Sequence, residues 1–230
     1  WPRCVQIAWQ LHDEMGNVLE HNDFLIKPEG YNIPYDAERI HGISTELAAQ
    51  DGISLDECLV LFNEVLSKTK FIVGQNLNFD LNIMGCEFHR LGVENNLDSL
   101  PILDTCTEKT ATMCQIPGGR GGKFKLPTLT ELHNHLFGVG FGDAHNATAD
   151  VEATTRCFLE LIRIREFTKE QLDVDDDYFK NFSEANPKPI QVIGFFLTDK
   201  YVYMKTYNFH IYTIIPNILF YNLPCNLVTL

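Results

Sequence analysis

The chain has 230 residues, of which 45% are hydrophobic and 21% charged, so it can bury one sizeable core and is not globally disordered. Its formal net charge of -13 argues against a protein that grips duplex nucleic acid through a basic face. It does not exclude an enzyme that holds the end of a strand through bound cations, because the ions supply the local positive charge.

The seven cysteines are odd in number and include no Cys-x-x-Cys pair, which predicts neither a disulfide framework nor a zinc site. This usage favours a reducing, cytoplasmic setting. No segment has the pattern of a signal peptide or of a membrane span, so we expect no membrane association. The chain begins at Trp1 inside an expected strand, and we therefore expect an N-terminal piece to be missing.

The first predicted elements form a β-hairpin. Residues 4–11 alternate between apolar and polar, residues 13–17 turn the chain, and residues 18–28 return it. Helices are expected at 45–50 and at 54–69, the second capped by Ser54. An apolar run at 71–76 is typical of a buried strand.

The next elements alternate between helix and strand. A helix from 79 ends at Gly92, a short strand follows at 101–105, and another helix ends at Gly138. The last clear helix follows His145 and carries an apolar stripe. A hairpin followed by alternating helices and strands predicts an α/β fold, in which a mixed sheet is flanked by helices.

Three stretches carry no regular pattern. Residues 116–125 are rich in glycine and include Arg120, Lys123 and Lys125, but lack the spacing of a phosphate-binding P-loop, so we interpret them as a surface loop able to touch a nucleic-acid backbone. Residues 168–190 are expected to be an acidic, solvated linker. Residues 191–230 form an aromatic-rich tail that could add strands, bind a partner or expose an aggregation-prone surface.

Two carboxylates occupy positions typical of ligand sites. Asp80 follows a buried strand at the start of a helix, and ligands of α/β sheets bind beyond the carboxyl ends of strands. Asp150 begins another helix, and His145 precedes it in a loop from which its imidazole could reach the site. The structural alternatives are helix-start aspartates favoured by the helix dipole and a histidine of the N-cap region.

Several motifs together resemble the DEDDh 3′–5′ exonucleases, a family that includes the proofreading epsilon subunit of bacterial DNA polymerase III and ribonuclease T. "GQNLNFD" (74–80) is similar to the family's second motif and "HNATAD" (145–150) to its third. "PYDAERIHGIS" (34–44) resembles the family's Pro-x-x-x-x-x-His-Gly-Ile segment, and "ILDT" (102–105) a strand and helix start. The resemblance runs in order from about Val5 to Arg163, so residues 1–167 are expected to be the exonuclease domain.

The resemblance implies a ribonuclease-H-like fold and a two-metal hydrolysis of phosphodiester bonds. It implies that Asp80 and Asp150 hold Mg²⁺ or Mn²⁺ and that His145 deprotonates the attacking water. His41 matches a position that contacts the terminal nucleotide, and Asp36 matches a second contact. The alternative for "HGI" is a turn whose backbone Gly42 sets.

The family's first motif, a strand with Asp-x-Glu that supplies two of four acidic ligands, is absent before residue 5. Asp13 and Glu14 lie in the hairpin turn and cannot replace it. We therefore expect the first strand to be lost and the chain as given to be nearly inactive. Two tight Mg²⁺ sites found by calorimetry would contradict this expectation.

The leading hypothesis is a metal-dependent 3′–5′ exonuclease, of proofreading type, on single-stranded or frayed 3′ ends. DNA is favoured over RNA, and a DNA polymerase subunit is a candidate partner in replication or repair. The alternative is a non-catalytic relative that binds nucleic acid or docks on a polymerase. Retention of both aspartates argues against it, because a buried carboxylate pair without metal costs stability.

Overall fold

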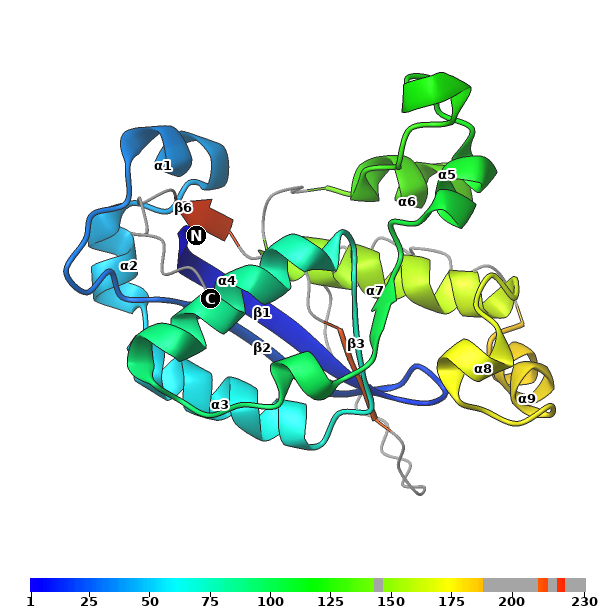
Figure 1. Cartoon of the computed structure of the whole chain (residues 1–230), viewed down its shortest axis with the longest axis horizontal. Coiled ribbons are helices and arrows are strands. Elements are labelled where there is room, and N and C mark those ends of the chain that lie inside the picture. The colour runs from blue at the N-terminus through cyan, green and yellow to red at the C-terminus, as the bar shows by residue number, and fades with distance from the viewer. Residues whose placement is uncertain (143–146, 188–210, 215–218, 222–230) are drawn as a thin grey trace, which may run out of the picture.

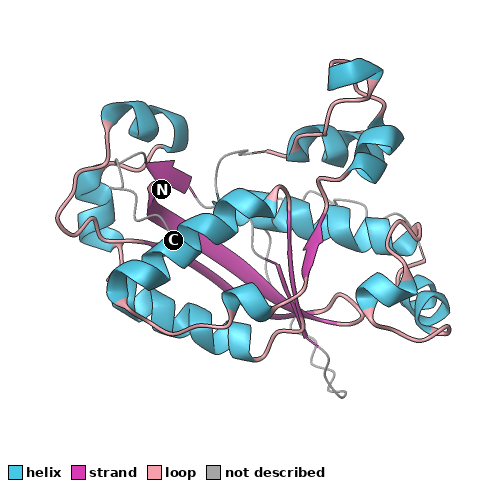
Figure 2. Ribbon diagram, viewed as in Figure 1, coloured by secondary structure: helices cyan, strands magenta, loops and turns pink. Residues whose placement is uncertain are grey.

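The computed structural model describes residues 1–142, 147–187, 211–214 and 219–221. Helices cover both faces of a mixed sheet, as the sequence predicts (Figures 1 and 2). Within the described residues the strand order is β2-β1-β5-β3-β4, and β6 pairs with β1. The strands are β1 (Arg3–Asp13), β2 (Val18–Leu25), β3 (Phe71–Gly74), β4 (Ile102–Asp104), β5 (Ile211–Ile214) and β6 (Leu219–Tyr221).

The predicted hairpin is formed by β1 and β2, which pair antiparallel from Gln6 opposite Leu25 onward. Its turn is closed by Asp13, whose carboxylate accepts hydrogen bonds from the backbone N–H groups of Met15 and Asn17 at 3.0 and 2.8 Å. Asp13 is therefore committed to the turn, as the sequence indicates.

The strand at the centre of the sheet, β5, is far from its neighbours β1 and β3 in the sequence. β5 runs antiparallel to β1, with Ile211 opposite Asp13, and parallel to β3 on its other side. β6 then continues along β1, with Tyr221 opposite Arg3. Residues 211–214 and 219–221 of the tail thus form strands, and β5 occupies the position between β1 and β3.

One face of the sheet is covered by α3 (Leu55–Ser67) and α4 (Leu77–Leu91). Aromatic rings join the layers here: the ring of Trp9 on β1 lies 5.4 Å from that of Phe62 on α3, centroid to centroid. α3 begins where Ser54 Oγ accepts a hydrogen bond from the Glu57 N–H, the predicted cap. α4 ends at Gly92, whose φ of +62° is the left-handed conformation that glycine tolerates.

The opposite face is covered by α6 (Leu129–Phe137) and α7 (Ala147–Arg163), which pack on Val73 and Leu103. The predicted linker contains α8 (Lys169–Leu172) and α9 (Tyr178–Ala185), and their Leu172 and Phe182 are fully buried in this same cluster. Residues up to 187 therefore pack against the helical layer instead of standing apart as a solvated linker. Apolar side chains at helical spacing within the acidic stretch account for the difference.

The remaining short elements are α1 (Tyr35–His41), α2 (Thr45–Asp51), η1 (Leu97–Ser99), α5 (Glu108–Cys114) and η2 (Arg120–Gly122). α1 and α2 form one projection from the sheet, and α5, η2 and α6 form another (Figure 1). None of the helices in the described residues combines the length and apolarity that crossing a bilayer requires.

The stability of this fold is expected to depend on pH through His133 of α6. Its ring is fully buried, and its Nδ1 lies 2.9 Å from the carbonyl oxygen of Val139. Burial lowers the pKa of His133 below its usual 6.5. The unfolded chain therefore takes up a proton that the folded ring resists, and the free energy of unfolding should fall as pH drops from about 7.5 to about 5.5.

We expect His133→Gln to make this fall smaller, because glutamine does not titrate while its amide can still donate to Val139. His135→Gln, at an exposed position of the same helix, is the matched control and should leave the pH dependence unchanged. Urea titrations at both pH values measure the effect. An equal fall in the two variants would show that His133 makes no contribution.

Candidate functional site

Asp80 lies in the first turn of α4, just beyond the carboxyl end of β3, as the sequence predicts. Asp80 is only 4% exposed. It lines a cavity of about 400 Å³ together with Gln75, Phe79, Cys106 and the segment 126–129. A carboxylate is thus present in the wall of a cavity at the end of a buried strand.

The start of α4 is fixed by a residue of the neighbouring strand. Asn76 has a left-handed φ of 60° and its side chain caps nothing. Instead, the carboxylate of Asp104, the last residue of β4, accepts hydrogen bonds from the N–H groups of Asn76 and Leu77, each at 2.9 Å. The motif "ILDT" predicts only a strand and a helix start, and it predicts no role for Asp104.

The opposite wall of the cavity is tied to the end of β3. Gln75 Nε2 donates to the carbonyl oxygen of Pro127 at 2.7 Å, and the Thr105 hydroxyl donates to Gln75 Oε1. α6 then begins at Thr128, which forms a reciprocal capping box with Glu131. The loop before α6 is thereby held at the end of β3, where it lines the same cavity as Asp80.

The basic loop of residues 116–125 is partly neutralised by neighbouring carboxylates. Lys125 Nζ lies 2.8 Å from Glu131, and Lys123 Nζ lies 3.5 Å from Glu108. Gly119 is required here, because a Cβ at this position would come within 2.3 Å of the Lys123 carbonyl oxygen. Less positive charge is thus available to a phosphate backbone than the sequence suggests.

Asp150 lies in the first turn of α7 and is 3% exposed. The beginning of α7 packs on β1 through contact of Ala147 and Val151 with Ala8. Beside it, the Thr148 hydroxyl donates to the carboxylate of Asp23 on β2, which also accepts from Gln6 Nε2 at 2.8 Å. The helix start is therefore attached to both strands of the hairpin.

His41 is the last residue of α1, and Gly42 follows it with a φ of +76°. The Ile43 N–H donates to His41 Nδ1 at 3.1 Å, so the ring proton resides on Nε2, which is buried and has no hydrogen-bond partner among the described residues. Burial lowers the pKa of His41, which favours this neutral form. Gly42 does set the turn, as the alternative interpretation holds.

A second cavity, of about 490 Å³, is lined by His41 together with Gln6, Asp23 and Leu47. Because Asp23 also contacts Thr148, this cavity borders the start of the helix that carries Asp150. Asp36 is exposed in the first turn of α1 and does not line the cavity. His41 therefore faces this cavity, and the role expected for Asp36 stays a prediction.

The two buried aspartates come from opposite helical layers and the same end of the sheet. Burial raises the pKa of the Cys4 thiol well above its usual value, and the charge of Asp80 contributes, which locates Asp80 near the start of β1. α7 begins beside Gln6 and Ala8 of that strand. His145 lies outside the described residues.

The described part of the chain contains no group of three or more His, Cys, Asp or Glu residues arranged to hold a metal ion. Its donor set is the pair Asp80 and Asp150. Hard carboxylate oxygens suit Mg²⁺ and Mn²⁺, and Mg²⁺ is commonly held by one or two carboxylates together with substrate phosphates. The two aspartates therefore fit such an ion, provided that the substrate completes its coordination.

Comparison with known proteins gives a consistent result. A family model described as exonuclease, of the RNase T type, matches residues 5–158. Solved structures of E. coli exonuclease I share the fold: the complex with a dA16 oligonucleotide has 22% identity and a TM-score of 0.58. The zinc-bound complex with single-stranded DNA has 24% identity and a TM-score of 0.59.

Each of these two alignments covers 74% of this chain but only 38% of the exonuclease I chain. This chain therefore spans about two fifths of the length of those proteins. No curated protein matches it.

Proposed function

Since this chain belongs to the exonuclease family, we propose that it is a metal-dependent nuclease that removes nucleotides from the 3′ end of single-stranded or frayed DNA. One observation carries the proposal: two buried carboxylates, Asp80 and Asp150, begin helices on either side of β1 at the same end of the sheet. Their hard carboxylate oxygens suit Mg²⁺ or Mn²⁺, ions that proteins commonly hold with one or two carboxylates together with substrate phosphates.

In this proposal Asp80 and Asp150 would hold Mg²⁺ or Mn²⁺ as two of the four acidic ligands of the family's site, and the substrate phosphate would complete the coordination. When bound, such ions neutralise the charge that develops on the phosphoryl oxygens. The site needs no extensive basic face, which agrees with the net charge of -13 and with the ion pairs of Lys123 and Lys125.

His145 takes the proton from the attacking water, whose oxygen forms a bond to phosphorus. The bond from phosphorus to the 3′ oxygen of the preceding nucleotide breaks, and a nucleoside 5′-monophosphate is released. Neutral His41 supplies its Nε2–H as a hydrogen-bond donor to the terminal nucleotide in the 490 Å³ cavity. Asp36, which is exposed, makes at most a contact at the rim.

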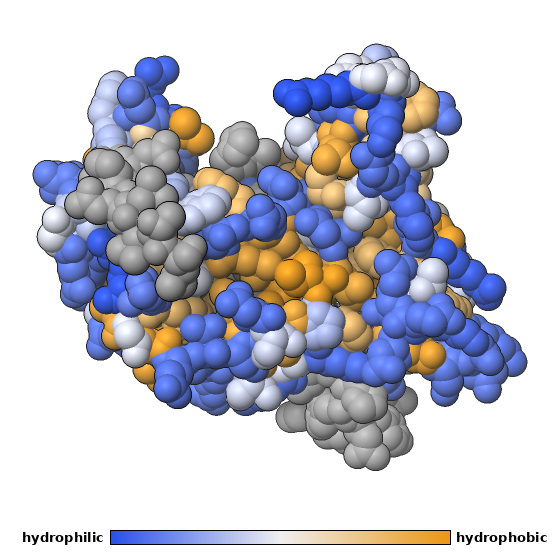
Figure 3. Space-filling model, viewed as in Figure 1, coloured by the Kyte–Doolittle hydropathy of each residue, from blue (hydrophilic) through white to orange (hydrophobic). Residues whose placement is uncertain are grey.

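The substrate would enter between the two projections of the molecule. The space-filling view is hollowed between the α1 projection and the one that carries α5, η2 and α6 (Figure 3). Exposed apolar side chains occur on both projections, among them Tyr35, Ile40 and Phe124. Unpaired bases stack on such surfaces, which favours a single strand over a duplex.

RNA stays an alternative substrate for the same site. Association with a DNA polymerase subunit, in the cytoplasm, is also part of the proposal.

A non-catalytic nucleic-acid-binding relative is the second candidate. Two observations favour it: β5, with the sequence "IYTI", adds no carboxylate to the middle of the sheet, and the described residues contain no cluster of three ligands. Such a protein would bind a single strand without cutting it.

A 3′-labelled oligonucleotide with Mn²⁺ or Mg²⁺ separates the two candidates. We expect slow release of nucleoside 5′-monophosphates that stops with a chelator and in Asp80→Asn and Asp150→Asn. Asp56→Asn, an exposed carboxylate in the first turn of α3, is the matched control and should keep full activity. Release that persists in both active-site variants would contradict the proposed site, and binding without release would establish the second candidate.

A further inference from the structure

We propose that Asp104 is a positioning residue that sets the place of the Asp80 carboxylate by capping α4 from the neighbouring strand. The proposal rests on the proposed function for the role of Asp80, but the cap itself can be tested independently. Asp104 carries no assignment from the sequence motifs beyond the end of a strand.

The contacts of Asp104 are those of a helix cap supplied by a different segment. One carboxylate oxygen accepts from the N–H groups of Asn76 and Cys106 at 2.9 and 2.7 Å, and the other accepts from the Leu77 N–H at 2.9 Å. The first N–H groups of a helix have no partner within it, so α4 obtains its partners from β4. A negative charge at this end of the helix also interacts favourably with its dipole.

Several other helices in the described part of the chain begin differently. α3, α5, α6 and α8 each begin with a serine or threonine whose own hydroxyl accepts a backbone N–H. α4 begins instead after Asn76 in a left-handed conformation, which asparagine adopts more readily than most residues, and the Asn76 side chain makes no cap hydrogen bond. The external cap supplies that missing partner at the sharp turn from β3 into α4.

Asp104 is itself held rigidly. It pairs with Gly74 in the parallel ladder of β3 and β4, and the next residue, Thr105, donates its N–H to the Gly74 carbonyl oxygen at 2.8 Å. The cap is therefore built on the sheet instead of on a loop. Asp80, one turn into α4, has a short side chain, so its carboxylate follows any displacement of the helix start.

Amide hydrogen exchange tests the cap without reference to activity. In Asp104→Ala we expect the amides of residues 76–80 to exchange roughly fivefold to thirtyfold faster, the factor that a helix cap of ordinary strength represents. Ser54→Ala removes the cap of α3 and is the matched control, in which exchange at 76–80 should not change. Unchanged exchange at 76–80 in Asp104→Ala would overturn the proposal.

Mn²⁺ titration by calorimetry tests the effect on Asp80. Contacts that orient a metal ligand typically contribute about 10- to 100-fold to metal affinity. Because Asp104 acts through the start of α4, we expect a loss of about 10-fold for Asp104→Ala and none for Ser54→Ala. Asp104→Asn keeps one acceptor oxygen and should give a smaller loss, and it replaces the alanine variant in both measurements if that variant does not fold. Equal affinity in wild type and the Asp104 variants would overturn the positioning role. If wild type binds no Mn²⁺, the proposed function fails, and the exchange experiment still decides whether Asp104 caps α4.

Discussion

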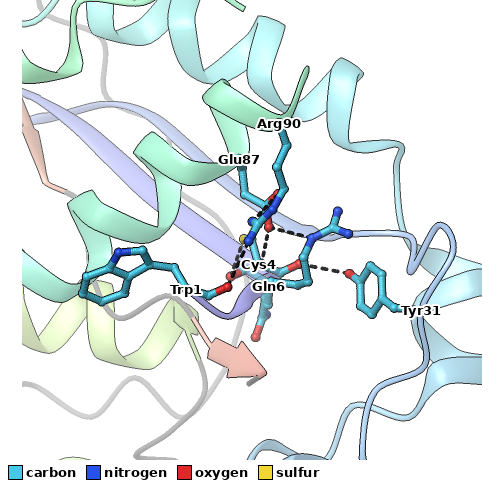
Figure 4. A network of polar contacts seen from close by, with 7 residues as sticks. Trp1, Cys4, Gln6, Tyr31, Glu87 and Arg90 are labelled. Atoms are coloured by element: carbon cyan, nitrogen blue, oxygen red, sulfur yellow. Dashed lines mark hydrogen bonds and ion pairs between the residues drawn. The ribbon is translucent and has the colours of Figure 1, made fainter. Parts of the chain in front are cut away.

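Glu87→Ala is expected to lower the free energy of unfolding by about 3–5 kcal/mol, the cost of leaving buried charges without their partner. Glu87 on α4 is fully buried, and its Oε1 accepts from Arg3 Nε at 3.1 Å and from the Cys4 N–H at 2.7 Å. Arg90 Nη1 forms an ion pair with Oε2 at 3.0 Å (Figure 4). Alanine would remove the negative charge that both guanidinium groups face.

The network also fixes the beginning of β1. Arg90 Nη2 donates to the Trp1 carbonyl oxygen at 2.9 Å, and the Tyr31 hydroxyl donates to that of Cys4 at 3.3 Å. The Arg3 guanidinium lies over the Tyr31 ring, 4.4 Å from its centroid. Loss of Glu87 should therefore destabilise the packing at the start of β1 as well as remove the ion pairs.

Glu64→Ala is the matched control for Glu87→Ala. Glu64 also lies on a helix and pairs with a basic side chain, Lys68, at 2.8 Å, but this pair is exposed. Exposed pairs of this spacing contribute little to stability, because solvent screens the two charges. Urea titrations of the two variants should therefore differ several-fold in the loss of stability. Similar losses would show that burial adds nothing to the network.

In an intact version of the protein that also carries the family's first motif, His145→Ala is expected to lower the rate of nucleotide release by roughly 10²- to 10⁴-fold, the usual contribution of a general base. The imidazole would no longer take the proton from the attacking water, whereas the carboxylates of Asp80 and Asp150 would stay in place. Mn²⁺ affinity measured by calorimetry should therefore change little. The rate is measured under single-turnover conditions on a 3′-labelled oligonucleotide.

His135→Ala, at an exposed position of α6, controls for the loss of a histidine near this part of the chain and should release nucleotides at the wild-type rate. If His145→Ala matches it, the histidine has no role as a base. If His145→Ala loses Mn²⁺ binding as well, the residue is a metal ligand and the assigned role is wrong.

Local chemistry made part of this structure predictable. Helix ends at Gly92 and Gly138 follow from the left-handed conformation that glycine adopts without penalty, and both occur as predicted. Ser54 caps α3 for the same kind of reason, because its hydroxyl and the Glu57 N–H are neighbours in sequence. The placement of Asp80 and Asp150 in first helical turns also follows from neighbouring residues alone.

Other features depend on residues far apart in sequence. Asp104 at the end of β4 caps α4, and these two elements are far apart in sequence, so no periodic pattern predicts the contact. Glu87 occurs in an amphipathic helix where a charge suggests solvent, yet Arg3 from the other end of the domain makes its burial tolerable. The pairing of β5 with β1 and β3 is likewise invisible in the tail, which has no clean alternation.

The central position of β5 determines the order in which the sheet can be completed during synthesis. β1 is made long before its partner at Asp13, Ile211, which emerges only after almost all the other described elements. Until then β1 and β3 each have an unpaired side, which can pair with another chain. Closing contacts of such long sequence separation is slow. A nascent chain therefore carries an incomplete sheet until β5 has been made, and pairing of β5 with β1 and β3 then removes these unpaired edges.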